Sequence, residues 1–169
     1  ALLDQILPLE PDLTDRLIRG IRVADIGCGR GKAMLLLAQV FPASRFLGLD
    51  IAAQAIAAAN AEAADLSLDN VRCIVHDAAE PLEPEAYDLI TTFDAVHDQG
   101  DPAAVLRNIH DALAPGGVYL MQDILASSRL SDNFSHPLAP FLYTVSCMHC
   151  MSVSLAAGGP GLGTMWGRE

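Results

Sequence analysis

The stretch Val23-Ala24-Asp25-Ile26-Gly27-Cys28-Gly29-Arg30-Gly31 decides the fold of this chain. Small and apolar residues lead into Asp25, as at the end of a buried strand, and three glycines at alternating positions precede a helix-like run over residues 32–41. Glycine adopts backbone angles that other residues avoid, and its missing Cβ lets a ligand lie against the main chain. The stretch therefore predicts a strand-to-helix turn that binds a nucleotide-like cofactor.

The spacing of the glycines narrows the class of cofactor. A dinucleotide fingerprint needs its third glycine at position 32, where this chain has Lys32. A phosphate-binding P-loop needs Ser or Thr after Gly-Lys, whereas Ala33 follows here. The pattern disfavours a dehydrogenase and a P-loop enzyme, and Asp25 is placed where it can hold a cationic group.

Strand-like and helix-like segments alternate along the chain, which predicts a parallel α/β sheet with helices on both faces. Strands are expected over residues 22–26, 45–49, 71–76, 87–93 and 118–123, and helices over residues 30–41, 52–66 and 105–113. The fifth strand is expected to form an unpaired edge of the sheet.

Acids close the first three strands at Asp25, Asp50 and Asp77, and Ala114-Pro115-Gly116-Gly117 precede the fifth strand. This ordered set resembles the Rossmann-like S-adenosylmethionine-dependent methyltransferases over residues 21–123. The resemblance implies a doubly wound, mostly parallel sheet in the order 3-2-1-4-5, with the last two strands of the family missing. It also implies S-adenosyl-L-methionine as the cofactor and a transferase activity, methylation of a small-molecule acceptor.

The resemblance assigns donor-binding roles to residues at the ends of four strands. Asp50 would accept hydrogen bonds from both ribose hydroxyls, and Asp77 would accept from the adenine amino group beside Ala78. The alternatives are a helix N-cap for Asp50 and a solvated loop acid for Asp77. The expected cofactor-binding residues are Asp25, Gly27, Cys28, Gly29, Gly31, Asp50, Ile51, Asp77, Ala78, Phe93 and Asp94.

His97 follows the fourth predicted strand, at the edge where ligands of open parallel sheets bind. Its context resembles the His-Asp-Trp-x-Asp context of small-molecule O-methyltransferases, in which the histidine is the base, although Gln99 replaces the tryptophan. We therefore expect His97 to be the catalytic base for a hydroxyl acceptor. The alternative is that His97 packs over the donor or caps the next helix.

The amino-acid composition limits the binding partners and the cellular setting that we expect for this chain. The net charge of −11, with no basic cluster, argues against nucleic acid as a substrate. Four cysteines on an apolar, alanine-rich background indicate a reducing, cytoplasmic setting. Neither a signal peptide nor an apolar run of about 18 residues is evident, so no membrane association is expected.

The domain organisation predicted is a helical lead-in over residues 1–20 and a methyltransferase domain over residues 21–169 that is incomplete at its C-terminal end. The missing initiator methionine and the glycine-rich end suggest an excised fragment. The apolar segment 137–155 is expected to form a helix broken near Pro140, which would cover the edge strand. Otherwise a second chain would cover it, as a homodimer.

Cys147-Met148-His149-Cys150 contains one Cys-x-x-Cys pair, whereas a structural zinc site needs four ligands. We expect no metal, and both cysteines buried on one helix face. For the domain as a whole, the alternative to an active enzyme is a catalytically inactive domain that binds S-adenosylmethionine and regulates a larger protein.

Overall fold

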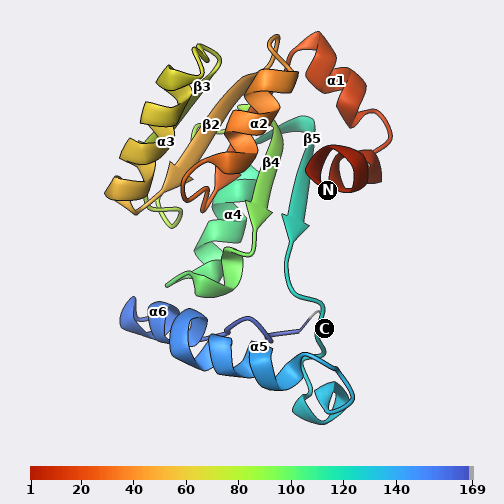
Figure 1. The fold of residues 1–169 in the computed structure, drawn as a ribbon, viewed down its shortest axis with the longest axis vertical. Coiled ribbons are helices and arrows are strands. Elements are labelled where there is room, and N and C mark those ends of the chain that lie inside the picture. Colours follow the sequence, from red (N-terminus) through yellow and green to blue (C-terminus); the bar gives the residue numbers. More distant parts are fainter. Residues whose placement is uncertain (168–169) are drawn as a thin grey trace.

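Five parallel strands form the centre of the fold, in the order β3-β2-β1-β4-β5 (Figure 1). The computed structural model describes residues 1–167. Every neighbouring pair of strands is parallel, so the predicted order and direction are confirmed. The strands are β1 (Arg22–Ile26), β2 (Arg45–Asp50), β3 (Val71–Val75), β4 (Tyr87–Phe93) and β5 (Leu113–Gln122).

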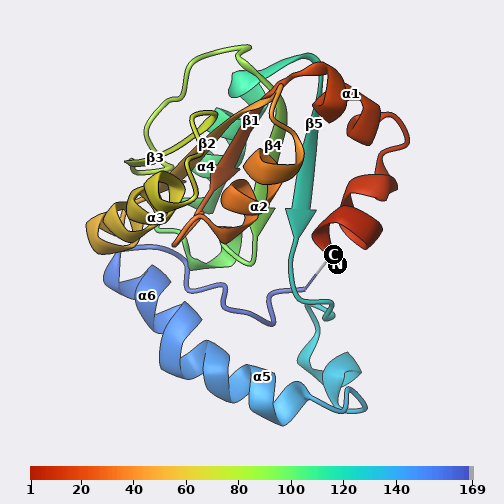
Figure 2. The same ribbon diagram turned by 45° about the horizontal axis from the view of Figure 1, so that its top comes forward.

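Helices cover both faces of the sheet (Figures 1 and 2). One face packs against α1 (Leu13–Arg19) and α2 (Lys32–Val40), with α3 (Ala53–Asp65) beside α2. The other face packs against α4 (Pro102–Ala112). The crossover from β3 to β4 contains no helix.

Alternation within the strands divides the core into two clusters. In β1, Val23 packs with α2, whereas Ala24 and Ile26 face α4. In β4, Leu89 and Ile90 divide between the clusters in the same way. Strands buried on both faces are typical of a parallel sheet between helices. Packing on both faces holds the strands in place, and with them the edge of the sheet at which their carboxyl ends lie.

Buried Asn70 joins the end of α2 to the start of β3. Its side-chain amide donates to the carbonyl oxygens of Ala38, Phe41 and Ser44 at 3.1, 3.3 and 3.2 Å. Asn70 is 5% exposed, so these carbonyl groups have little access to water. One side chain therefore satisfies three backbone acceptors of the turn before β2.

The N-terminal helical segment is part of the core. After η1 (Leu2–Ile6) and η2 (Leu7–Leu9), the side chains of Leu7, Leu13 and Leu17 are buried against the α2 face. The sequence predicts the helical character of this lead-in. The division into a lead-in and a domain at residue 20 stays a prediction, and residues 168 and 169 of that domain lie outside the described residues.

Two element boundaries differ from the predictions by more than two residues. Helix α4 begins at Pro102 instead of residue 105, because the Asp101 carboxylate accepts a hydrogen bond from the Ala104 N–H at 2.8 Å and proline favours the first helical position. Strand β5 begins at Leu113, which pairs with Tyr87 before an irregularity in the register. The glycines that we expected to precede the strand lie inside it.

A continuous helical run, Ala139–Ala156, lies across the carboxyl ends of the strands (Figures 1 and 2). It consists of α5 (Ala139–Val145), the π-helical η5 (Ser146–Cys150) and α6 (Met151–Ala156). The expected break near Pro140 is wrong, because this proline occupies the first turn, where it costs no intrahelical hydrogen bond. The run also does not cover the outer strand as expected. Beside that strand, Ile6 and Leu9 of the N-terminal segment line a small hollow with Leu120 and Met121 of β5.

By length and composition, this run of 18 residues is the one helix among the described residues that is long and apolar enough to cross a membrane. The expectation that no apolar run reaches this length is therefore wrong. Only 22% of the run is buried. Length and composition alone are weak evidence for a membrane span.

Candidate functional site

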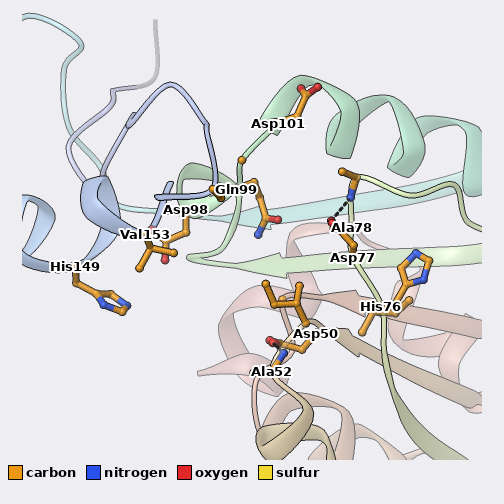
Figure 3. Close-up of a pocket in the computed structure, with 16 residues that line it drawn as sticks. Asp50, Ala52, His76, Asp77, Ala78, Asp98, Gln99, Asp101, His149 and Val153 are labelled. Carbon is orange, nitrogen blue, oxygen red and sulfur yellow. Dashed lines mark hydrogen bonds between the residues drawn. The ribbon is translucent and has the colours of Figure 1, made fainter. Parts of the chain in front are cut away.

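A cavity of about 600 Å³ lies at the carboxyl edge of the sheet, between the strands and α6 (Figure 3). Parallel sheets bind ligands at this edge, where the strand order reverses between β1 and β4. The lining residues are Gly27, Leu49, Asp50, Ile51, Ala52, His76, Asp77, Ala78, Ala79, Asp98, Gln99, Gly100, Asp101, His149, Val153 and Ala157.

The turn after β1 needs glycine at alternate positions. Gly27, Gly29 and Gly31 have φ angles of 73°, 54° and 67°, which are in the left-handed region. A Cβ added to Gly27 would lie 2.5 Å from the Ala95 Cβ, so packing also excludes a side chain there. A Cβ added to Gly29 would meet nothing within 4 Å. The bare backbone at Gly29 therefore faces open space that a bound molecule can fill.

Asp50 ends β2 and lines the cavity, as Figure 3 shows. Its Oδ2 accepts a hydrogen bond from the Gly29 N–H and its Oδ1 accepts one from the Ala52 N–H, both at 2.8 Å. Each oxygen keeps a further lone pair, because a carboxylate accepts about four hydrogen bonds. The backbone thus fixes the carboxylate in one orientation while leaving it able to accept from a diol.

Asp77 and Ala78 follow β3 and also line the cavity (Figure 3). Asp77 Oδ1 accepts a hydrogen bond from the Ala79 N–H at 2.9 Å, which fixes the carboxylate within the loop. The Asp77 carboxylate is exposed and the neighbouring Ala78 is buried. An acceptor group beside a small apolar residue suits a flat ring that bears an amino group.

Asp25 lies under the glycine turn and is 2% exposed. Its Oδ1 accepts a hydrogen bond from the Thr91 hydroxyl at 2.7 Å. Burial removes water from the carboxylate and raises its pKa from 3.8 to about 7; the Thr91 hydrogen bond acts in the opposite direction, and the nearby Asp50 charge adds to the rise. Asp25 is not among the residues that line the cavity.

His97 lies in η3 (Val96–Asp98) and is 0% exposed. Its Nδ1 faces both oxygens of Asp123 at 3.1 Å, and its Nε2 lies 3.1 Å from Asp98 Oδ1. Burial by itself lowers the pKa of His97, but interaction with the Asp123 and Asp98 carboxylates raises it to about 11. The ring is not in the lining of the cavity, whereas the next residue, Asp98, is. Its predicted role as base stays a prediction, and the burial and carboxylate partners of the ring argue against it.

The structure brings five of the predicted cofactor-binding residues to the cavity: Gly27, Asp50, Ile51, Asp77 and Ala78. Gly29 and Gly31 shape the turn beside it. Three others lie elsewhere. The Cys28 thiol contacts Cys73, close to Gly48, and their hydrogen bond together with burial raises the pKa of Cys28. Phe93 lines the hollow beside β5, and Asp94 is half-exposed with a φ of 55°.

The helical run contributes His149 and Val153 to the lining, its C-cap residue Ala157 also lines the cavity, and the three residues are spaced four apart. Side chains at this spacing lie on one helix face, so this pattern is the signal that finds them in the sequence. Phe141 of the same run is 66% exposed and lies outside the lining. Cys147 is also exposed and Cys150 is buried, so the prediction that both are buried is wrong.

The charges of the cavity favour a cationic ligand. Within the described residues 1–167, the cavity lining contains four aspartates and two histidines but no lysine or arginine. A pyrophosphate would meet only repulsion from these carboxylates, whereas a sulfonium or ammonium group would be attracted. About two-thirds of the lining residues carry no charge, as is usual in small-molecule sites.

Comparisons with known proteins agree with this geometry. A family model described as "Methyltransferase domain" matches residues 18–153. The chain is 34% identical over 131 residues to the ubiquinone biosynthesis O-methyltransferase of Neisseria meningitidis, covering 72% of this chain and 52% of that protein. It is 33% identical over 125 residues to the arsenite methyltransferase of Aquipseudomonas alcaligenes, covering 69% of this chain and 36% of that protein. The chain thus spans about half or less of the length of these relatives.

The fold of this chain is also similar to that of a methyltransferase of known structure. The S-adenosylmethionine-dependent methyltransferase of Mesorhizobium loti superposes with a TM-score of 0.57 and is 29% identical, over 66% of this chain and 52% of that one.

Proposed function

This chain belongs to the S-adenosylmethionine-dependent methyltransferases, and from that premise we propose that it binds S-adenosylmethionine in the cavity and methylates a small molecule. The bound cofactor supplies a methyl group on a positively charged sulfur. The chain's own residues hold and orient the two reactants, since methyl transfer is an in-line displacement that depends mainly on positioning.

The observation that supports this proposal is the arrangement of Asp50 and Gly29. The Asp50 carboxylate is held by two backbone N–H groups at 2.8 Å and keeps lone pairs for the two ribose hydroxyls. The bare Gly29 backbone beside it leaves room for the rest of the molecule. Asp77 would accept from the adenine amino group, with Ala78 against the ring. The residues present therefore fit an adenosyl group with a cationic end.

The acceptor would lie between the mouth of β4 and α6. The lining there combines Val153 and Ala157 with Gln99 and His149, which suits a small, partly apolar molecule. A hydroxyl acceptor is the finer proposal, and it is supported by the relative named as an O-methyltransferase. A reaction at a hydroxyl releases a proton, and His97 as its base stays a prediction. A His97→Gln variant that binds the cofactor and keeps full turnover would refute that role.

Calorimetry with S-adenosylmethionine and S-adenosylhomocysteine tests the proposal. Wild-type protein is expected to bind both, and Asp50→Ala is expected to bind at least about 30-fold more weakly, because hydrogen bonds to a charged group contribute about 1.5–3 kcal/mol each. Asp69→Ala, in an exposed turn away from the cavity, is the matched control. Binding by neither compound, or equal binding by Asp50→Ala, would refute the site.

Turnover is a separate measurement from binding. Formation of S-adenosylhomocysteine with a panel of phenolic and carboxylate acceptors is expected if the domain is an active enzyme. Tight cofactor binding with no turnover on any acceptor would favour the alternative, a catalytically inactive binding or regulatory domain.

We further propose a cytoplasmic setting, supported by four free cysteines, and no nucleic-acid or membrane partner. A homodimer through the outer strand β5 remains a proposal, supported by the position of that strand at the edge of the sheet. Light scattering at two protein concentrations tests it, and a mass of one chain at both would refute it.

A further inference from the structure

A cluster of side chains of the types that ligate metal ions adjoins the cavity, and His97 lies at its centre. One ligand atom each of His97, Asp98 and Cys150 can be chosen so that all lie within 4.8 Å of one another. His97 and Cys150 are 0% and 5% exposed. The first two residues belong to η3 and the third belongs to η5, so the cluster joins the loop after β4 to the helical run.

Two atoms of this cluster lack a hydrogen-bond partner. His97 Nε2 and Asp98 Oδ1 are both buried and unsatisfied, although they lie only 3.1 Å apart. An unsatisfied buried polar group is destabilising, and more so when it is charged. Two ligand atoms on one tetrahedral Zn²⁺, each at about 2.0 Å from the ion, are about 3.3 Å apart. A short separation without a hydrogen bond therefore suits two atoms that bind the same ion.

We propose that His97 Nε2, Asp98 Oδ1 and Cys150 Sγ bind one Zn²⁺-class ion. Imidazole, carboxylate and thiolate are the usual protein ligands of zinc, and the two negative charges of the set balance the charge of the ion. Three protein ligands leave the fourth tetrahedral position for water or a bound molecule. Asp98 also lines the cavity, so the ion lies at the wall of the proposed cofactor and acceptor site.

The surroundings of the three ligands have the form expected around a metal. The other ring nitrogen of His97, Nδ1, faces both oxygens of Asp123 at 3.1 Å. Ligating histidines almost always donate from their second nitrogen to such a group, which fixes the ring and directs Nε2 to the ion. On the opposite side, the Thr164 hydroxyl lies 2.8 Å from Cys150 Sγ and can donate a hydrogen bond to a thiolate.

The π-helical segment explains why the sequence analysis wrongly places both cysteines on one buried helix face and expects no metal there. Cys147 and Cys150 form a Cys-x-x-Cys pattern, but Cys147 is exposed and only Cys150 is buried beside His97. Within η5 each turn contains more residues than in an α-helix, so side chains three apart no longer share a face. The ligand set is therefore assembled from two distant parts of the sequence.

Cobalt binding tests the site directly. Protein purified without added metal is analysed for zinc, then stripped by dialysis against a chelator and titrated with Co²⁺. We expect about one ion per chain and a thiolate-to-cobalt charge-transfer band in the near ultraviolet. Cys150→Ser is expected to lose the band and Cys147→Ser, the matched control three residues away, to keep it. Asp98→Asn keeps the thiol and is expected to bind at least tenfold more weakly, and Asp123→Asn about 10–100-fold more weakly.

Thermal melting establishes that each variant is folded, and if Cys150→Ser is not, Asp98→Asn carries the test. The proposal is overturned if folded wild-type protein binds neither Zn²⁺ nor Co²⁺ at micromolar concentrations, which would leave His97 as a protonated ion-pair partner of the two aspartates. It is also overturned if the band survives in Cys150→Ser or is lost in Cys147→Ser. Cofactor calorimetry is independent of these readouts, so the two proposals can fail separately.

Discussion

Replacing Asp25 by asparagine is expected to remove a pH dependence of stability that this one buried carboxyl imposes. Asp25 is 2% exposed, and burial raises its pKa from 3.8 to about 7. The fold therefore favours the neutral carboxyl. The free energy of unfolding contributed by Asp25 is greatest below pH 3.8, falls as the pH rises towards 7, and stays level above it.

The magnitude follows from the size of the shift. A rise of about 3 pH units corresponds to about 4 kcal/mol between the two ends of the range, at about 1.4 kcal/mol per unit. Between pH 5 and pH 8 the expected change is about 2–3 kcal/mol. Asparagine has nearly the same shape and does not titrate, so the stability of Asp25→Asn relative to wild type should rise by this amount over the same interval.

Urea unfolding of both proteins at pH 5, 6, 7 and 8 measures this difference. The other titrating groups are the same in both proteins and cancel when the two free energies are subtracted. Any constant cost of the asparagine amide beside Thr91 also leaves the slope unchanged. Asp69→Asn is the matched control for replacing an aspartate. A difference between Asp25→Asn and wild type that stays constant within about 0.5 kcal/mol would refute the argument from burial.

Three further substitutions test the packing of the fold and of the cavity. Gly27→Ala would place a methyl group 2.5 Å from the Ala95 Cβ at a φ of 73°, so thermal unfolding should show a loss of about 1–3 kcal/mol; an unchanged melting temperature would contradict the clash. Asn70→Ala removes the amide that donates to three carbonyl groups, of which only Phe41 keeps another donor, the Ser44 N–H; urea unfolding should show a loss of about 2–4 kcal/mol, whereas a loss below about 1 kcal/mol would show that water replaces the amide. Ser154→Ala removes the hydroxyl that donates to the Gln99 carbonyl at 2.8 Å, so calorimetry should show weaker cofactor binding by about threefold to tenfold, and unchanged binding would show that α6 is held without it.

The strand pattern was predictable because strands buried on both faces appear in the sequence as short, nearly continuous apolar runs. Residues 22–26 and 87–93 are apolar enough to read as strands buried on both faces, and both are observed with these bounds. The position of Asp50 was predictable for a similar reason, since the carboxyl ends of parallel strands meet at one edge. Local capping set the start of α4 at Pro102, a signal present in Asp101-Pro102 that the helical rhythm alone does not show.

The surroundings of His97 could not be predicted from spacing. Its partners, Asp123 and Cys150, come from the end of β5 and from a π-helical segment more than 50 residues away in the sequence. In the sequence alone, a histidine between two acids is equally compatible with a catalytic base, a helix cap or a metal ligand. Only the folded arrangement shows that both ring nitrogens face buried groups and that the ring has no exposed surface.

The two backbone hydrogen bonds of Asp50 have an entropic consequence. An aspartate side chain that no other group holds loses rotamer freedom when it binds a ligand, at a cost of about 0.5–1.5 kcal/mol for an immobilised side chain. In this chain the Asp50 side chain loses its rotamer freedom on folding, because the Gly29 and Ala52 amides hold the carboxylate in place before a ligand binds. The side chain behaves as a rigid template, and lengthening it by one methylene in Asp50→Glu would forfeit the preorganisation while keeping the charge.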